Sequence, residues 1–134
     1  MKKINSLLII VLIVSMLYSC SNNPQEMIIG SWKIKSIESS AKMNDVEKQM
    51  FTEANEDLTA NESYEFSASK LIVKYGEIKN DATWELSEDG KNLSFVLADG
   101  KDYIYQIVEM SSNKMVWKTN IDNSYDITTT LEKK

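Results

Sequence analysis

The stretch at residues 82–110, ATWELSEDGKNLSFVLADGKDYIYQIVEM, decides the fold, because it contains three successive amphipathic β-strands joined by short turns. Apolar and polar residues alternate along it with the period of two that is typical of a strand with one buried face. Both interruptions end in Asp-Gly, at Asp89-Gly90 and at Asp99-Gly100. This dipeptide is favoured in type I′ hairpin turns, whose two central residues need φ > 0. The stretch therefore predicts an antiparallel sheet built from consecutive hairpins.

The same alternation continues on both sides of this stretch and predicts eight strands in all. They are expected at residues 27–38, 63–67, 70–75, 81–87, 92–98, 101–110, 114–120 and 124–132. Further turns are indicated at 111–113 and at Asp122-Asn123. Eight short sequential strands are best accommodated by an all-β, up-and-down antiparallel barrel, since closure removes the sheet edges and buries one face. A β-sandwich is the alternative fold.

One face of the predicted barrel is apolar and rich in aromatic side chains, which makes it the candidate ligand-lining surface. Its candidate ligand-lining residues are Tyr64, Phe66, Val73, Tyr75, Trp84, Phe95, Trp117 and Tyr125. The strand at 101–110 can present either face, depending on the loop before it. A two-residue turn at Asp99-Gly100 would point Ile104, Gln106 and Val108 inward, whereas a three-residue loop would point Tyr103, Tyr105 and Ile107 inward. We prefer the interpretation with the tyrosines inside.

The period changes after the first strand, where residues 44–59 are predicted to form a helix. Apolar residues recur there at helical spacing, at Val46, Met50, Phe51, Ala54 and Leu58. Asn44 and Glu47 have the spacing of a capping box, which marks a helix N-terminus. In an up-and-down barrel this helix would cross one open end, so its apolar residues are candidates for a lid over the aromatic interior. The alternative is a permanent plug that makes the same contacts.

The chain resembles the lipocalin-like domains of bacterial envelope lipoproteins. The resemblance rests on Gly30-Ser31-Trp32 at the start of the first strand, on the helix that follows, and on Trp84-Glu85-Leu86 before an Asp-Gly hairpin. It implies that Trp32 is a structural plug at one end of the barrel. Lipocalins proper place an arginine from the last strand over this tryptophan, and this chain has no arginine.

The first twenty residues resemble a bacterial lipoprotein signal peptide. Lys2 and Lys3 form a positive n-region, and residues 7–17 are an apolar run. A transmembrane helix, the alternative, needs roughly 20 apolar residues, more than this run provides. Ser19 and Cys20 match the end of a lipobox, in which the cysteine receives a diacylglycerol and becomes the first residue after cleavage.

This second resemblance divides the chain into three parts. It implies a signal peptide at residues 1–19, a lipidated cysteine with a tether at 20–26, and the barrel domain at 27–134. The protein is then expected in the cell envelope of a Gram-negative-type bacterium, attached to the outer membrane through its N-terminal lipid.

The amino-acid composition argues against most classes of enzyme. The chain has no histidine and no arginine, and Cys20 is its only cysteine. Without these residues it lacks the commonest general base, the commonest metal ligand and the bidentate phosphate clamp. A formal net charge of −5 disfavours nucleic acid as a partner. We therefore expect no enzymatic activity, catalytic residue, metal or cofactor.

Two functions fit these observations. An eight-stranded barrel is just wide enough to be filled by side chains or to hold one small ligand. The sequence favours a membrane-anchored lipoprotein that binds a small apolar or amphipathic molecule. The alternative is a tethered envelope scaffold or a protein-interaction or inhibitor module, whose barrel is filled and whose protein partner the sequence does not name.

Overall fold

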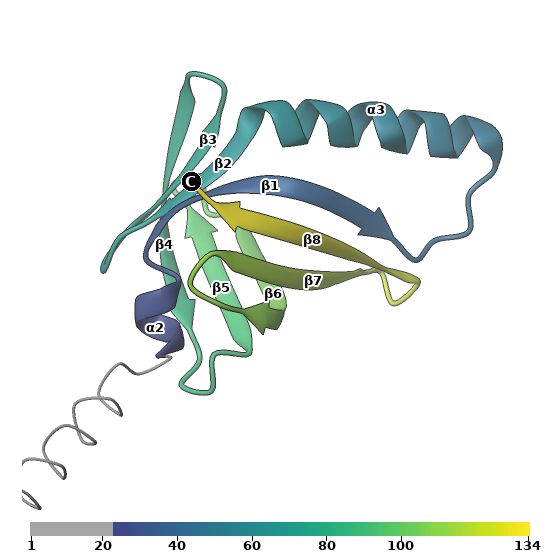
Figure 1. Ribbon diagram of the computed structural model, residues 1–134. Helices are drawn as coiled ribbons and strands as arrows, with labels where there is room; N and C mark the ends of the chain where they lie inside the picture. The colour runs from purple at the N-terminus through teal and green to yellow at the C-terminus, as the bar shows by residue number, and fades with distance from the viewer. Residues whose placement is uncertain (1–22) are drawn as a thin grey trace, which may run out of the picture.

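A computed structural model describes residues 23–134, which form a closed antiparallel barrel of eight strands in sequence order (Figure 1). The strands are β1 (Gly30–Ser39), β2 (Glu62–Phe66), β3 (Leu71–Tyr75), β4 (Ile78–Leu86), β5 (Asn92–Leu97), β6 (Asp102–Met110), β7 (Lys114–Ile121) and β8 (Tyr125–Lys133). Each strand pairs with its neighbour in sequence, and β1 also pairs with β8 to close the barrel. The predicted fold is thus confirmed.

Two helices accompany the barrel among the described residues. Helix α3 (Asp45–Asn61) joins β1 to β2 and begins with the predicted capping box. The amide of Glu47 donates to Asn44 Oδ1 at 2.9 Å, and the amide of Asn44 donates to Glu47 Oε2 at 3.1 Å. Neither helix is long and apolar enough to cross a membrane.

The shorter helix, α2 (Pro24–Met27), lies where the sequence predicted a tether and the start of the first strand. Proline suits the first turn of a helix, and the Asn23 side chain caps this one by accepting a hydrogen bond from the amide of Gln25. The Gln25 side chain also donates to the backbone oxygen of Leu86 at 2.8 Å. The chain before β1 is therefore packed against the barrel from Pro24 onward.

The two Asp-Gly turns differ from the type I′ prediction, which is wrong for both. Only their glycines have positive φ, +73° at Gly90 and +90° at Gly100. Each aspartate side chain instead accepts a hydrogen bond from the amide two residues later, which holds a longer loop. The turn whose two central residues both have positive φ is Asp122-Asn123.

The loop at Gly100 determines which face of β6 is buried. Leu97 and Lys101 are joined by a backbone hydrogen bond of 2.9 Å, so three residues form the connection. Tyr105 and Ile107 consequently point toward the interior, whereas Ile104 is 69% exposed. The preferred inward face of this strand is thus confirmed at Tyr105 and Ile107, whereas Tyr103, on the same face, is exposed.

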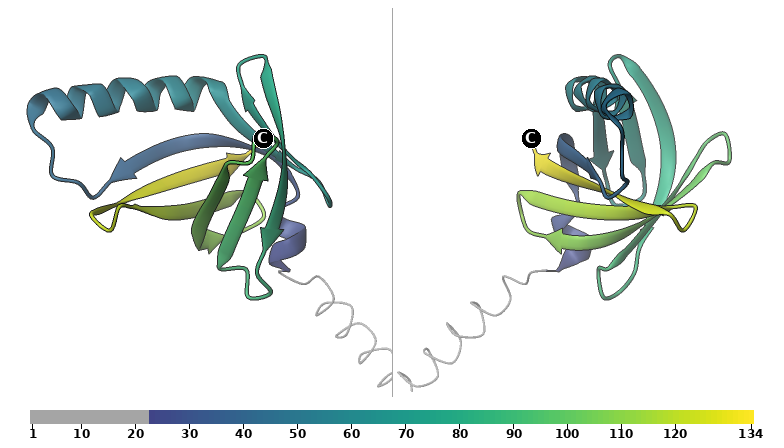
Figure 2. Two further views of the ribbon diagram at one scale, coloured as in Figure 1. Left: turned by 180° about the vertical axis from the view of Figure 1, so that it is seen from behind. Right: turned by 90° about the vertical axis from the view of Figure 1, so that its right-hand side faces the viewer.

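The barrel wall is incomplete along the second half of β1, and α3 lies there. β1 pairs with β2 only over residues 30–33, whereas its pairing with β8 continues to Ser39. Helix α3 runs beside this free edge, as Figures 1 and 2 show from three directions. The Asn55 side chain donates to the backbone oxygen of Ile37 at 3.1 Å, replacing a bond that a strand would make.

The centre of the barrel is filled by large side chains. Trp32 is fully buried, and its indole nitrogen donates to the backbone oxygen of Ile28 at 2.8 Å. The other fully buried large side chains are Trp117, Phe66, Ile28, Leu71, Leu93, Met115 and Leu131. Burial of an apolar side chain contributes about 1.5–3 kcal/mol, so this cluster is the main source of stability.

Candidate functional site

One groove lies at the open end of the barrel, between the start of α3, the end of β1 and the start of β8. It has a volume of about 850 Å³. Its walls come from the inward faces of the strands, the loop after β1 and the first turns of the helix. The lining residues are Ser39, Ser40, Ala41, Lys42, Met43, Glu47, Met50, Phe51, Ser124, Tyr125 and Ile127. We call this the mouth groove.

The mouth groove has the chemistry of a site for an amphipathic molecule. Thioether and aromatic side chains from α3 and β8 form an apolar surface, while Lys42 and Glu47 place one charge of each sign at its border. Methionine adapts its shape to different apolar partners because its chain is unbranched and flexible. Figure 1 places the β7–β8 turn, which borders the groove, at the opposite end of the domain from α2.

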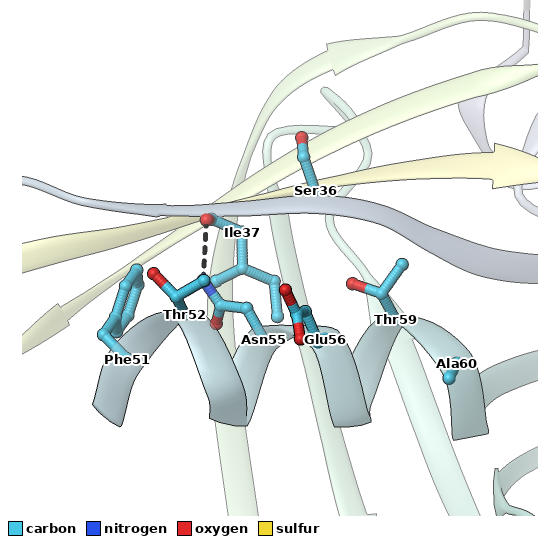
Figure 3. Close-up of a pocket in the computed structure, with 8 residues that line it drawn as sticks. All are labelled: Ser36, Ile37, Phe51, Thr52, Asn55, Glu56, Thr59 and Ala60. Carbon is cyan, nitrogen blue, oxygen red and sulfur yellow. Dashed lines mark hydrogen bonds between the residues drawn. The ribbon is translucent and has the colours of Figure 1, made fainter. Parts of the chain in front are cut away.

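A second groove, of about 540 Å³, follows α3 toward its C-terminus and is shown in Figure 3. Ile37 points from β1 toward the helix, between Phe51 and Asn55, whereas Ser36 lies on the other side of the strand. Thr52, Asn55, Glu56 and Thr59 contribute polar atoms to the wall that α3 gives this helix groove. Phe51 lines both grooves and separates them.

Further inside, aromatic rings form a continuous wall across β2, β5, β6 and β7. The Tyr64 ring meets the Trp117 ring edge-on at 5.0 Å between centroids, and Tyr105 stacks on Trp117 at 4.8 Å. Phe95 stacks against both Tyr103 and Tyr105, at 5.1 and 5.5 Å. Such contacts add about 0.5–1.5 kcal/mol per pair beyond burial, so the wall contributes to the stability of the barrel.

The carboxylate of Glu62 lies next to this aromatic wall. Glu62 is the first residue of β2, shares the inward face with Tyr64 and is half-buried. Burial raises the pKa of Glu62, and a hydrogen bond with the Tyr64 hydroxyl partly opposes that rise. Burial and the nearby Glu62 charge raise the pKa of Tyr105 to about 12. Tyr64 and Tyr105 are therefore neutral at physiological pH.

The barrel and its site geometry agree with a comparison against known families. The sequence model of the family described as lipocalin-like domain matches residues 28–117. The chain belongs to the lipocalin-like domain family. Comparison with curated proteins gives no match. Lipocalin-like barrels are suited to ligand binding in general, and the matched residues include β1, α3 and the aromatic wall.

The predicted ligand-lining residues lie in four different parts of this lipocalin-like domain. Tyr64, Phe95 and Trp117 lie together in the aromatic wall, and Tyr125 lines the mouth groove. Phe66, Val73 and Trp84 contribute to the packed core, where the Trp84 indole donates to the backbone oxygen of Ser67 at 2.8 Å. Tyr75 stands at the rim, and its hydroxyl donates to Asp57.

The predicted lid residues do not form one buried stripe. Phe51 lines the grooves, and Leu58 packs against the core. Val46, Met50 and Ala54 are exposed, although Met50 also borders the mouth groove. The helix contacts the barrel along a face that includes Asn55, because the free edge of β1 offers it a backbone acceptor. An apolar pattern does not reveal such a polar contact.

The two other predicted site residues are Trp32 and Cys20. Trp32 is fully buried beside Ile28 and Lys133, at the end of the barrel near α2, so its surroundings fit the structural plug that was predicted. Cys20, the predicted lipidation site, lies outside the described residues. Among residues 23–134, no three acidic or other metal-ligating side chains gather in a way that could hold a metal ion.

The sequence interpretation missed Lys133 and Glu62. Lys133 lies over Trp32, and Glu62 borders the aromatic wall. Alternation could have indicated Glu62, because it is two residues before Tyr64 and must share its face.

Proposed function

We propose that this lipocalin-like domain binds a small apolar or amphipathic molecule in the mouth groove. The observation that carries the proposal is the groove itself, whose volume lies in the range of small-molecule sites. Met43, Phe51 and Tyr125 supply apolar contact, and Lys42 and Glu47 provide polar partners at the border. The packed core of the barrel, which includes Trp32, Phe66 and Trp117, restricts this ligand to the open end.

The first test is binding of a neutral apolar fluorophore, Nile red, to the purified full chain. Saturable fluorescence enhancement is expected. Phe51→Ala should weaken it by about tenfold, or about 1.4 kcal/mol, because Phe51 borders both grooves. Val46→Ala is the matched control, since Val46 is exposed on the same helix and lines neither groove. Absence of saturable binding, or equal loss in both variants, would refute the proposal.

A tethered interaction module is the second candidate. The outer faces of β5 and β6 expose Val96, Ile104 and Val108, three apolar side chains on adjacent strands. Exposed apolar surface of this kind favours contact with a protein partner. This candidate gains support if Nile red does not bind and if Ile104→Lys abolishes a specific protein contact.

We also propose that the domain is held at an outer membrane by a lipid on Cys20 and that it has no enzymatic activity. The support for anchoring is the lipobox-like sequence and the absence of another cysteine. Because the mouth groove lies at the far end from α2, an anchor preceding α2 would leave the groove facing away from the bilayer. A ligand would then enter from the aqueous side.

A further inference from the structure

Strand β6 changes its neighbours along its length. It pairs with β5 over residues 102–106, whereas its pairing with β7 begins only at Gln106. Strand β7 in turn continues beyond Lys118 to Ile121, and there it pairs with β8 alone. In Figure 1, β7 and β8 run across the view, while β5 and β6 run steeply. The wall of the barrel is therefore split between the start of β6 and the end of β7.

A groove of about 590 Å³ lies in this split, and we call it the side groove. Residues of both strands line it, among them Asp102, Ile104, Tyr105 and Gln106 from β6 and Lys118 and Asn120 from β7. Ile104 is 69% exposed on the outer surface, whereas Tyr105 faces the interior and stacks on Trp117. The side groove thus has lining residues from both faces of the sheet and lies between the two strands.

The backbone of β6 presents free hydrogen-bonding groups to the side groove. The amide of Ile107 donates to the backbone oxygen of Lys91 at 2.7 Å, so Ile107 directs its backbone groups toward β5. These groups point to alternate sides of a strand from one residue to the next. Counting back from Ile107, both Asp102 and Ile104 direct their N–H and C=O groups into the side groove. Neither β7 nor any side-chain bond found among residues 23–134 supplies them with a partner.

The other free edge of the barrel has a cover that β6 lacks. Along the second half of β1, α3 lies beside the strand, and the Asn55 side chain bonds the backbone oxygen of Ile37. At the start of β6, by contrast, Asp102 and Ile104 are both exposed, so the edge is open to solvent. An exposed strand edge is a template on which another extended chain can pair.

We propose that the side groove binds an extended peptide segment of a partner protein, which adds a strand to the free edge of β6. The N–H and C=O groups of Asp102 and Ile104 form the ladder, and main-chain bonds of this kind supply affinity whatever the peptide sequence. We expect the antiparallel direction, which is the commoner one in sheets. Successive peptide side chains then lie alternately beside Ile104 on the outer surface and beside Tyr105 at the interior.

The charges of the side groove indicate which peptide it prefers. Two carboxylates line it, Asp102 and Asp126, and among the described residues only Asp126 forms an ion pair, with Lys118 Nζ at 3.9 Å. Opposite charges at facing strand positions attract, so a peptide lysine belongs opposite Asp102. A β-branched residue fits beside Ile104, because such residues pack well against cross-strand neighbours. The preferred segment is therefore β-branched and followed by a lysine.

This inference goes beyond the proposed function and does not depend on it. The side groove and the mouth groove have no lining residue in common. Phe51→Ala, the variant that tests the mouth groove, should therefore leave peptide binding unchanged. Failure of Nile red to bind and failure of a peptide to bind are thus separate results.

The probe is the peptide Thr-Val-Thr-Val-Lys, acetylated and amidated at its ends. Calorimetry measures its binding to the purified full chain, and we expect saturable binding with a Kd below about 1 mM. When the lysine lies opposite Asp102 in the antiparallel direction, the central threonine lies opposite Ile104 and directs its N–H toward β6. The valine before it directs its N–H away from β6, because these groups alternate.

N-methylation of the peptide distinguishes strand addition from apolar contact. A methyl group on the nitrogen of the central threonine removes a donor of the ladder and should weaken binding at least about tenfold. The same methyl group on the preceding valine is the matched control and should leave most of the affinity. Both modified peptides keep every side chain, so contacts of the side chains alone predict equal binding.

Variants of the protein test the same edge. Ile104→Pro removes the free N–H and should abolish binding, since proline is tolerated on a strand edge whose N–H faces solvent. Ile104→Val keeps the amide and a β-branched side chain and should bind like wild type. Replacing the peptide lysine by glutamate should weaken binding, and Asp102→Asn should remove this difference. Glu85→Gln should retain it, because Glu85 is exposed on β4 and does not line the side groove.

A measurement on the wild-type chain does not depend on the folding of a variant. In residue-resolved hydrogen exchange, the amide of Ile104 should exchange much faster than that of Tyr105, which is bonded to β5, and the peptide should slow it. An Ile104 amide as protected as that of Tyr105 in the free protein, no saturable binding, equal loss from the two N-methylations, or full binding to Ile104→Pro would each overturn the proposal. Peptide protection near Phe51 in place of Ile104 would also overturn it.

Discussion

The ammonium nitrogen of Lys133 lies 5.0 Å from the centroid of the Trp32 ring. The same nitrogen donates to the backbone oxygen of Met27 at 3.0 Å, so one side chain joins the end of β8 to α2 and to the buried tryptophan. A Cβ atom at Gly30 would come within 2.8 Å of Lys133 Cε, and Gly30 has φ +131°. Glycine at position 30 thus leaves room for the lysine. Lys133 occupies the place over the tryptophan that the lipocalin resemblance assigns to an arginine.

Replacing this lysine should destabilise the domain. Lys133→Met keeps most of the apolar stem but loses the hydrogen bond and the cation–π contact, which should cost about 1–2 kcal/mol of unfolding free energy. Lys133→Arg should restore most of that loss. Urea unfolding of the full chain measures both, with Lys134→Met as the control for an exposed neighbouring lysine. A loss equal to that of the control would show that the contact contributes nothing.

Trp32→Ala should have a larger effect. The ring is completely buried and its indole nitrogen is hydrogen-bonded, so removing it leaves a cavity and an unpaired carbonyl. The expected cost is about 3–5 kcal/mol, a large part of the stability of a small domain. Chemical denaturation measures it. A change below about 1 kcal/mol would contradict a packing role for this residue.

Much of the fold could be predicted because its information is local. Alternation places one face of each strand inside, and the capping box at Asn44 fixes the start of α3. The aromatic wall follows from the same alternation once Tyr103 and Tyr105 are placed inward. These features can be predicted without knowing which strands pair with one another.

The remaining features depend on contacts between distant parts of the chain. Lys133 reaches Trp32 only after β8 has closed the barrel against β1. Asn55 contacts β1 because β2 is too short to pair with the whole of that strand. A search for apolar residues at helical spacing cannot predict this contact, because asparagine is polar. Helix α2 has only four residues, too few for a periodic pattern.

Glu62 should make stability depend on pH in a defined direction. Burial raises its pKa from the ordinary value of 4.5, so the folded state favours the protonated carboxyl. This contribution is present below the unfolded pKa and is lost as pH rises through the folded pKa. Glu62→Gln should therefore gain stability relative to wild type as pH rises from below 4.5 to neutrality.

Glu65→Gln should change the pH dependence of stability in the opposite direction, although Glu65 lies on the same strand as Glu62. A hydrogen bond from Lys74 lowers the pKa of Glu65, so its contribution is present above the unfolded pKa and is lost as pH falls through the folded value. The glutamine variant should lose stability relative to wild type at neutral pH. Urea unfolding of both variants across this range checks the prediction, which fails if the two follow the same trend.

Lipidation is tested at the only cysteine. Cells expressing the full chain and supplied with labelled fatty acid should incorporate the label, and the protein should sediment with membranes. Cys20→Ser should abolish both, because no other thiol can accept the lipid through a thioether. Met27→Ser tests whether a nearby change has the same effect through folding. Label that persists in Cys20→Ser would show that the attachment site lies elsewhere.

The last prediction concerns the mobility of α3. No residue of this helix is fully buried, and its anchors are Leu58, the bond from Asn55 to Ile37, and the contact between Asp57 and Tyr75. Few buried contacts place a segment at the low-stability end of a domain. We therefore expect the amides of α3 to exchange with deuterium before those of β5, which holds the fully buried Leu93.

Removing a contact of α3 should speed the deuterium exchange of its amides, whereas binding of a ligand should slow it. Asn55→Ala should speed exchange in α3 without affecting β5, because it removes the bond that holds the helix on the free edge of β1. Gln49→Ala is the control, since its side chain bonds only within the helix. Nile red should slow exchange near Phe51 if it binds in the mouth groove, since a ligand there contacts both helix and strand. If α3 and β5 exchange together and Nile red changes neither, the helix is a permanent part of the wall, and the interaction module becomes the better account of this domain.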